Sequence, residues 1–86
     1  MTWAVDFTTN ARTDLVGLDP EVSEVITDVL VAWAQNGPPL GNRRELGGMV
    51  FYESTVAERY LLGYRVRAGQ QAFVVLWLRR KPGDSR

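Results

Sequence analysis

Residues 72–78 constrain the fold more than any other part of this 86-residue chain, because they are apolar without interruption (AFVVLWL). A strand with one face in water alternates apolar and polar residues, whereas a strand that is apolar on both faces is typical of the middle of a sheet. The run ends at Arg79-Arg80-Lys81, and Pro82-Gly83 then break it. The sequence therefore predicts a central strand over residues 72–79.

Three other segments have strand character. Trp3, Val5 and Phe7 recur at every second position, which is the period of a strand with one buried face. Residues 49–55 and 60–67 predict two more strands, and residues 68–71 form a short hairpin connection to the central strand. Residues 37–48, rich in Gly and Pro, are predicted to be a loop that carries Arg43 and Arg44.

Two helices are predicted between the first and second strands. Thr8 or Thr9 can cap a short helix that Gly17 ends, and Asp19-Pro20 opens a second helix that stops at about residue 35. The second helix has an apolar stripe at helical spacing, formed by Val22, Val25, Ile26, Val29, Leu30 and Trp33. The order β-α-α-β-β-β predicts a single α+β domain over residues 1–86, with a helical hairpin packed on a mainly antiparallel four-stranded sheet.

Charge divides the chain into two halves, although the formal net charge is zero. Residues 1–42 carry six acidic side chains and one basic, whereas residues 43–86 carry nine basic and four acidic. Nine of the ten cations are Arg, whose guanidinium group suits phosphate or carboxylate recognition. The basic half is therefore a candidate surface for an anionic polymer.

The residue types that are missing exclude several kinds of chemistry. Without Cys the chain has no disulfide framework and no thiolate metal site, and without His it lacks the commonest acid–base residue and metal ligand. We therefore expect no metal and no cofactor. The sequence has no signal-peptide pattern and no apolar run of membrane-spanning length, so we expect a cytoplasmic protein.

Seven short stretches, in their order and spacing, resemble the RelE/ParE superfamily of toxins from type II toxin–antitoxin pairs. They cover residues 3–8 (WAVDFT), 11–15 (ARTDL), 18–22 (LDPEV), 38–40 (PPL), 46–48 (LGG), 58–62 (ERYLL) and 73–81 (FVVLWLRRK). The resemblance implies a RelE/ParE-like fold, a toxin activity and a cognate antitoxin as partner.

Two features depart from the pattern of the ribonuclease members. Residues 52–55 lack the usual basic side chains, and residues 82–86 contain neither the His nor the Tyr that commonly follows the last strand.

The resemblance and the chemistry of RNA cleavage together nominate the site residues. Attack by a 2′-hydroxyl group needs a base, an acid and cations around the phosphate. Arginine stays protonated because of its very high pKa and is a poor base, whereas a carboxylate held by a nearby arginine could serve. The catalytic candidates are Arg59, Arg80 or Arg79 as cations and Glu58 or Glu53 as base. The candidates for RNA binding are Arg43, Arg44, Arg65, Arg67 and Lys81, and those for antitoxin binding are Val31 and Asp28 on the second helix. Trp3, Trp33 and Trp77 are expected in the core.

The sequence is compatible with three functions. The first is a toxin that arrests growth by ribosome-dependent cleavage of mRNA, which would make the protein an endoribonuclease. The second is a ParE-like toxin that inhibits DNA gyrase without catalysis, which Glu53 and the missing His and terminal Tyr favour. The third is an inactive interaction module of the same fold.

Overall fold

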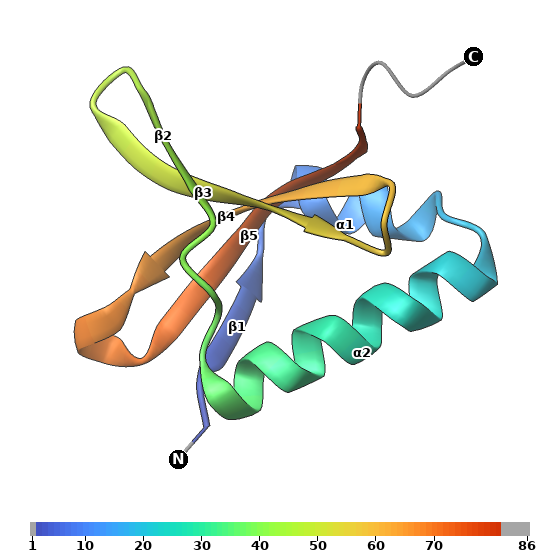
Figure 1. Ribbon diagram of the computed structural model, residues 1–86, viewed down its shortest axis with the longest axis horizontal. Coiled ribbons are helices and arrows are strands. Elements are labelled where there is room, and N and C mark those ends of the chain that lie inside the picture. Colours follow the sequence, from blue (N-terminus) through green and yellow to red (C-terminus); the bar gives the residue numbers. More distant parts are fainter. Residues whose placement is uncertain (1, 82–86) are drawn as a thin grey trace.

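The structure is a computed structural model that describes residues 2–81, so the predictions for residues 82–86 lie outside the described part (Figure 1). The helices and strands, in chain order, are β1 (Ala4–Phe7), α1 (Thr9–Val16), α2 (Pro20–Asn36), β2 (Asn42–Leu46), β3 (Met49–Val56), β4 (Tyr60–Arg67), a 3₁₀ turn (Ala68–Gln70) and β5 (Ala72–Arg80). Both helices begin where predicted. The hydroxyl of Thr8 accepts a hydrogen bond from the Ala11 amide at 3.1 Å, and Pro20 opens α2.

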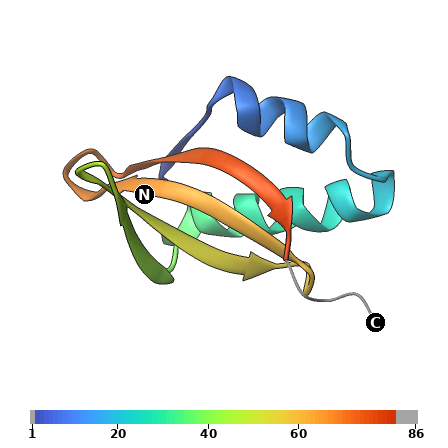
Figure 2. The ribbon, with the colours of Figure 1, turned by 90° about the horizontal axis from the view of Figure 1, so that it is seen from above.

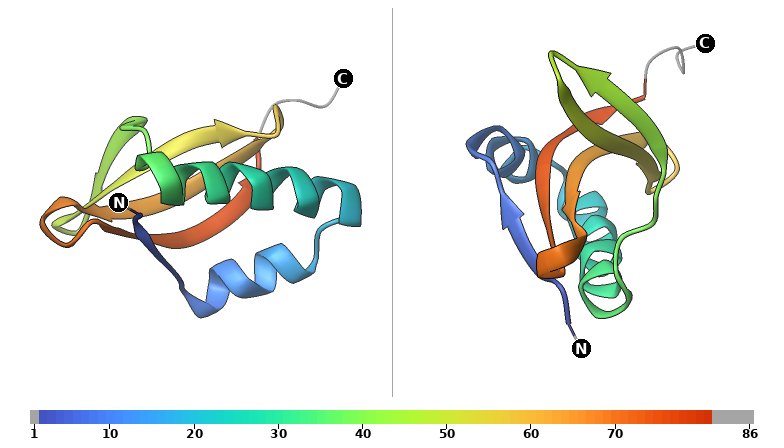
Figure 3. Two further views of the ribbon diagram at one scale, coloured as in Figure 1. Left: turned by 90° about the horizontal axis from the view of Figure 1, so that it is seen from below. Right: turned by 90° about the vertical axis from the view of Figure 1, so that its left-hand side faces the viewer.

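The sheet has the strand order β1-β5-β4-β3-β2, so β5 lies between two other strands as its apolar sequence predicts. Strand β1 pairs with β5 in parallel, and the remaining neighbours are antiparallel. Helix α2 runs along one face of this twisted sheet (Figure 3). Its Trp33 ring contacts Tyr64 and Phe73, with centroid separations of 5.0 and 6.0 Å, and the core lies between α2 and these strands.

Strand β2 corrects the sequence-based prediction, which placed a loop over residues 37–48 and only four strands in the sheet. Every residue of β2 is exposed, so the strand has no buried face whose period could be recognised. Its pairing with β3 is fixed by the two-residue turn Gly47-Gly48, in which both φ angles are positive (58° and 83°). Such a turn favours glycine and is a recognised signal for a β-hairpin. The fold class is confirmed, with five strands in place of four.

Helix α1 lies beside β5, beyond the end of the short β1 (Figure 2). The Thr8 hydroxyl donates to the Leu76 carbonyl at 2.6 Å, and the Leu78 amide donates to the Asp14 carboxylate at 3.0 Å. These side chains occupy backbone groups of β5 that β1 is too short to reach.

A β-bulge in β5 changes which side chains face the core. Val75 pairs with Tyr64 and Trp77 pairs with Gly63, so Leu76 is an extra residue in the ladder. Phe73, Val75 and Leu78 are buried in the core, whereas Trp77 lies on the opposite face of the sheet. The expectation that Trp77 is a core residue is therefore wrong, while Trp3 and Trp33 do pack against the core.

No helix within residues 2–81 combines the length and the hydropathy that crossing a membrane requires.

Candidate functional site

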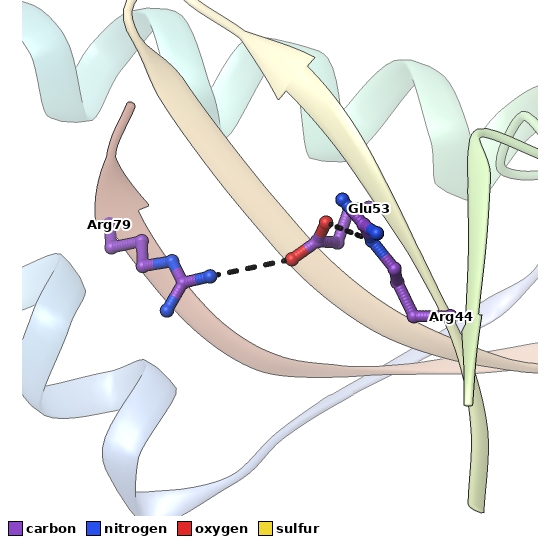
Figure 4. A network of polar contacts seen from close by, with 3 residues as sticks. All are labelled: Arg44, Glu53 and Arg79. Atoms are coloured by element: carbon purple, nitrogen blue, oxygen red, sulfur yellow. Dashed lines mark hydrogen bonds and ion pairs between the residues drawn. The ribbon is translucent and has the colours of Figure 1, made fainter. Parts of the chain in front are cut away.

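A buried carboxylate, Glu53, lies between two arginines on the sheet face opposite α2 (Figure 4). Glu53 is only 5% exposed. The Arg44 Nε donates to its Oε1 at 2.8 Å, and the Arg79 Nη2 lies 3.6 Å from its Oε2. Burial of a carboxylate costs free energy unless opposite charges and hydrogen bonds compensate, and here each oxygen has its own guanidinium group.

These three side chains come from three strands, and β4 separates two of them. Arg44 is on β2, Glu53 on β3 and Arg79 on β5, with Gly63 of β4 paired opposite Glu53. A Cβ atom on Gly63 would overlap the indole ring of Trp77, so glycine is required at this position. The bare backbone of Gly63 leaves the space across β4 in which Trp77 and Arg79 lie.

Trp77 forms a small aromatic cluster on this face, separate from the core. Its ring meets Phe51 edge-on, with the centroids 6.3 Å apart, and the Cζ atom of Arg79 lies 4.4 Å from its centroid. We call this side of the sheet the open face and define it by Arg44, Phe51, Glu53, Arg65, Trp77 and Arg79.

The other catalytic candidates gather at the β3–β4 turn, next to the end of β5. The Lys81 amide donates to the Arg59 carbonyl at 2.8 Å, and Arg80 pairs with Tyr60. Glu58 lies in the turn itself with a φ angle of 68°, and the preceding Ala57 also has a positive φ of 51°. Left-handed backbone is strained for both residue types. Arg80 points to the face opposite Arg79, so the bulge determines that Arg79 is the cation that reaches Glu53.

The remaining candidates for RNA binding on the sheet lie on two strands, β2 and β4. Arg65 and Arg67 are exposed on β4, and Arg43 lies 3.9 Å from Glu45 on exposed β2. Arg44, nominated only for RNA binding, is held by Glu53. The sequence does not reveal this ion pair, because the pair depends on the β2–β3 hairpin, whose first strand has no apolar period. The turn Gly47-Gly48 is the signal that could have found it.

The two candidates for antitoxin binding are exposed on α2. Val31 is 50% exposed and lines a shallow groove of about 260 Å³ between α2, α1 and β1. The other groove residues are mainly apolar: Val5, Phe7, Leu15, Thr27, Leu30 and Ala34. Asp28 is exposed on the same helix. Across residues 2–81, no three carboxylate, His or Cys side chains lie close enough together to hold a metal ion.

Comparison with known proteins relates this fold to RelE toxins. No family model matches the sequence, and no curated protein does. Among solved structures, a chain of the RelBE2 toxin–antitoxin complex from Mycobacterium tuberculosis matches with a TM-score of 0.74 and 23% identity over 94% of this chain and 93% of that one. The RelE–RelB complex from Pyrococcus horikoshii gives a TM-score of 0.73 and 16% identity, covering 99% and 100%. The isolated RelE toxin from E. coli gives 0.73 and 21%, covering 96% and 88%. The predicted resemblance is confirmed at the level of structure, and the chain has the fold of RelE toxins.

Proposed function

We propose that this protein is the toxin of a type II toxin–antitoxin pair and that it cleaves mRNA on the ribosome. Two observations support the proposal: the likeness to RelE structures along nearly the whole chain, and the position of the basic residues. Arg79 lies on the open face, and Arg59 and Lys81 lie at the adjoining turn. These cations come from distant parts of the sequence and meet at one end of the sheet.

In this proposal Glu53 is a positioning residue. Both of its oxygens are engaged by arginines and the side chain is buried, so it has little access to a substrate hydroxyl group. Arg79, whose side chain is 62% exposed, has further N–H groups that can donate to a phosphate oxygen. Glu53 thus fixes the direction in which Arg79 presents its donors.

The exposed Glu58 is then the remaining candidate for the base; it lies in the β3–β4 turn and lines a groove with Glu21 and Val25 of α2. It accepts the proton of the 2′-hydroxyl group as that oxygen attacks the adjacent phosphorus. The bond from phosphorus to the 5′-oxygen breaks, Lys81 gives that oxygen a proton, and a 2′,3′-cyclic phosphate remains. Arg79 and Arg59 stabilise the negative charge that develops on the phosphate during the reaction.

The proposed partner is an antitoxin that covers the helical side of the molecule. The groove beside Val31 exposes apolar surface, and such surface is typical of protein contacts. The RelE–RelB and RelBE2 complexes are solved examples of this fold with a partner.

Inhibition of DNA gyrase without catalysis is the second candidate function. Glu53 favours it, because a carboxylate between Arg44 and Arg79 lowers the positive charge of the open face. A gyrase inhibitor would need neither Glu58 nor Lys81 as proton carriers.

Expression without antitoxin tests these functions, with growth, ribosome-bound message and DNA damage measured in parallel. For a ribonuclease, Arg59→Ala and Arg79→Ala should each lower cleavage by roughly 100- to 1000-fold, as expected when one charged donor at the reacting group is lost. Arg12→Ala, an exposed arginine on α1, is the matched control and should leave cleavage unchanged. Intact message during growth arrest, together with DNA damage, would support gyrase inhibition instead. Normal growth at high soluble expression would exclude both toxin activities.

A further inference from the structure

The guanidinium group of Arg79 is held against the open face from two directions. Its Cζ atom lies 4.4 Å from the centroid of the Trp77 ring, and its Nη2 atom lies 3.6 Å from the Glu53 carboxylate. The side chain is nevertheless 62% exposed. One side of the planar group is thus supported by protein, and much of the side chain remains in contact with water.

The support beneath Arg79 is itself rigid. Trp77 lies directly on the backbone of Gly63, where even a methyl group would overlap the ring, and Phe51 meets its edge. Because Phe51 is only 8% exposed, the indole has little freedom to move sideways. The position of the guanidinium group is therefore set before any ligand arrives.

We propose that Arg79 and Trp77 form a nucleobase subsite, in which one base of single-stranded RNA stacks on the outer face of the Arg79 guanidinium group. This inference rests on the proposed function, since it assigns part of the same face to the RNA. Guanidinium planes and aromatic rings are the surfaces on which proteins stack unpaired bases. The geometry gives Arg79 two roles: its edge forms an ion pair with Glu53 and donates to a phosphate, and its plane contacts a base.

The surrounding charge fits a nucleic acid strand better than it fits a free base. Arg44 and Arg65 lie on the same face, and Arg67 follows at the end of β4. Their positive charge on the same side of the sheet favours the phosphates of a strand over an uncharged base. An arginine that made only phosphate contacts would bind the backbone regardless of whether a base was attached, which provides the test.

The experiment compares two labelled single-stranded oligonucleotides of the same length, a short oligoadenylate and its abasic counterpart. Both carry 2′-O-methyl riboses, which removes the attacking hydroxyl group and prevents cleavage. One stacked base should make the oligoadenylate bind about 5- to 100-fold more tightly than the abasic strand. Arg79→Lys keeps the charge and removes the plane, so this ratio should fall to nearly one while affinity for the abasic strand changes little.

Arg12→Lys is the matched control, because it makes the same change at an exposed arginine on α1, outside the open face, and it should preserve the ratio. Trp77→Leu should reduce the ratio through loss of the support. Equal binding of both oligonucleotides by the unmodified protein, or an unchanged ratio in Arg79→Lys, would overturn the subsite. The outcome is independent of cleavage. If the ratio falls in Arg79→Lys but cellular message stays intact, the result supports the subsite and contradicts the ribonuclease activity. If the ratio is unchanged in Arg79→Lys but message is cleaved, the result refutes the subsite and leaves the ribonuclease activity standing.

Discussion

The phenol group of Tyr64 is hydrogen-bonded to the carbonyl of Pro39, which joins the centre of the sheet to the segment between α2 and β2. The same oxygen accepts from the Gly41 amide at 3.3 Å and lies 2.9 Å from the Ser54 hydroxyl. Tyr64 is completely buried. One side chain therefore fixes where the chain leaves α2 and, through it, where β2 begins.

Removal of this hydroxyl should destabilise the protein. We expect Tyr64→Phe to lower the free energy of unfolding by about 1–3 kcal/mol, because buried polar partners would lose their hydrogen bonds. Tyr52→Phe is the control: its ring centroid lies 6.1 Å from that of Tyr64, and the hydrogen bonds to Pro39 and Gly41 come from Tyr64. Its effect should stay below about 0.5 kcal/mol in urea unfolding. Equal losses would show that the bonds to the 39–41 segment are unimportant.

Glu53→Gln should change RNA binding and stability in opposite directions. The amide cannot balance the charge of Arg44, so this arginine becomes available to a phosphate, and the salt dependence of binding to single strands should steepen by about 0.7 for that added contact. The free energy of unfolding should fall by about 1–2 kcal/mol. The loss stays this small because both arginines are exposed, so water already screens their attraction to Glu53. Titrations with single-stranded RNA at several salt concentrations, together with thermal melts, measure both effects.

Glu45→Gln is the control. It removes the same charge from the exposed pair with Arg43 and should change the free energy of unfolding by less than about 0.5 kcal/mol. An identical salt response in the two variants would mean that net charge alone accounts for it.

Gly63→Ala should disturb the open face specifically. The added methyl group would overlap Trp77, and overpacking of this kind costs roughly 1–3 kcal/mol. Gly69→Ala, where nothing lies within 4 Å of the new methyl group, should be nearly neutral in the same unfolding assay. When Trp77 is also changed to Leu, Gly63→Ala should lower the free energy of unfolding by less than it does in the unmodified protein. An equally large loss in both proteins would show that the methyl group clashes with a residue other than Trp77.

The β3–β4 turn allows stability and catalysis to be separated. Glu58 and Ala57 both have positive φ angles, so Glu58→Gly and Ala57→Gly should each stabilise the protein by about 0.5–1 kcal/mol in thermal unfolding. Only Glu58→Gly removes the proposed base, and only this variant should lose cleavage of ribosome-bound message. Retained cleavage in Glu58→Gly would eliminate Glu58 as the base.

Local sequence patterns were sufficient to predict the helices and most of the sheet. Thr8, Pro20 and Gly17 mark helix ends through short-range chemistry, and β5 is recognisable because both of its faces are covered. Strand β2 was not predicted, since its five exposed residues have no apolar period and only the turn Gly47-Gly48 identifies it.

The candidate site was harder to predict, because it depends on register between strands. Simple alternation along β5 places Trp77 with Phe73 and Val75 in the core. The bulge at Leu76 reverses that alternation, moving Trp77 and Arg79 to the open face and Leu78 into the core. The sequence left Arg79 and Arg80 as alternatives, and a single extra residue in the ladder distinguishes them.

Helix α1 also has a consequence for how this protein behaves at high concentration. An unpaired strand edge is a template onto which another chain can add its own strand, which leads to aggregation. Beyond the end of β1, the side chains of Thr8 and Asp14 already occupy groups on the edge of β5. The outer edge of the sheet, β2, carries Arg43, Arg44 and Glu45, and charged side chains discourage strand addition. Asp14→Ala would leave the Leu78 amide without its acceptor and is the single change that we expect to make the purified protein self-associate through its sheet.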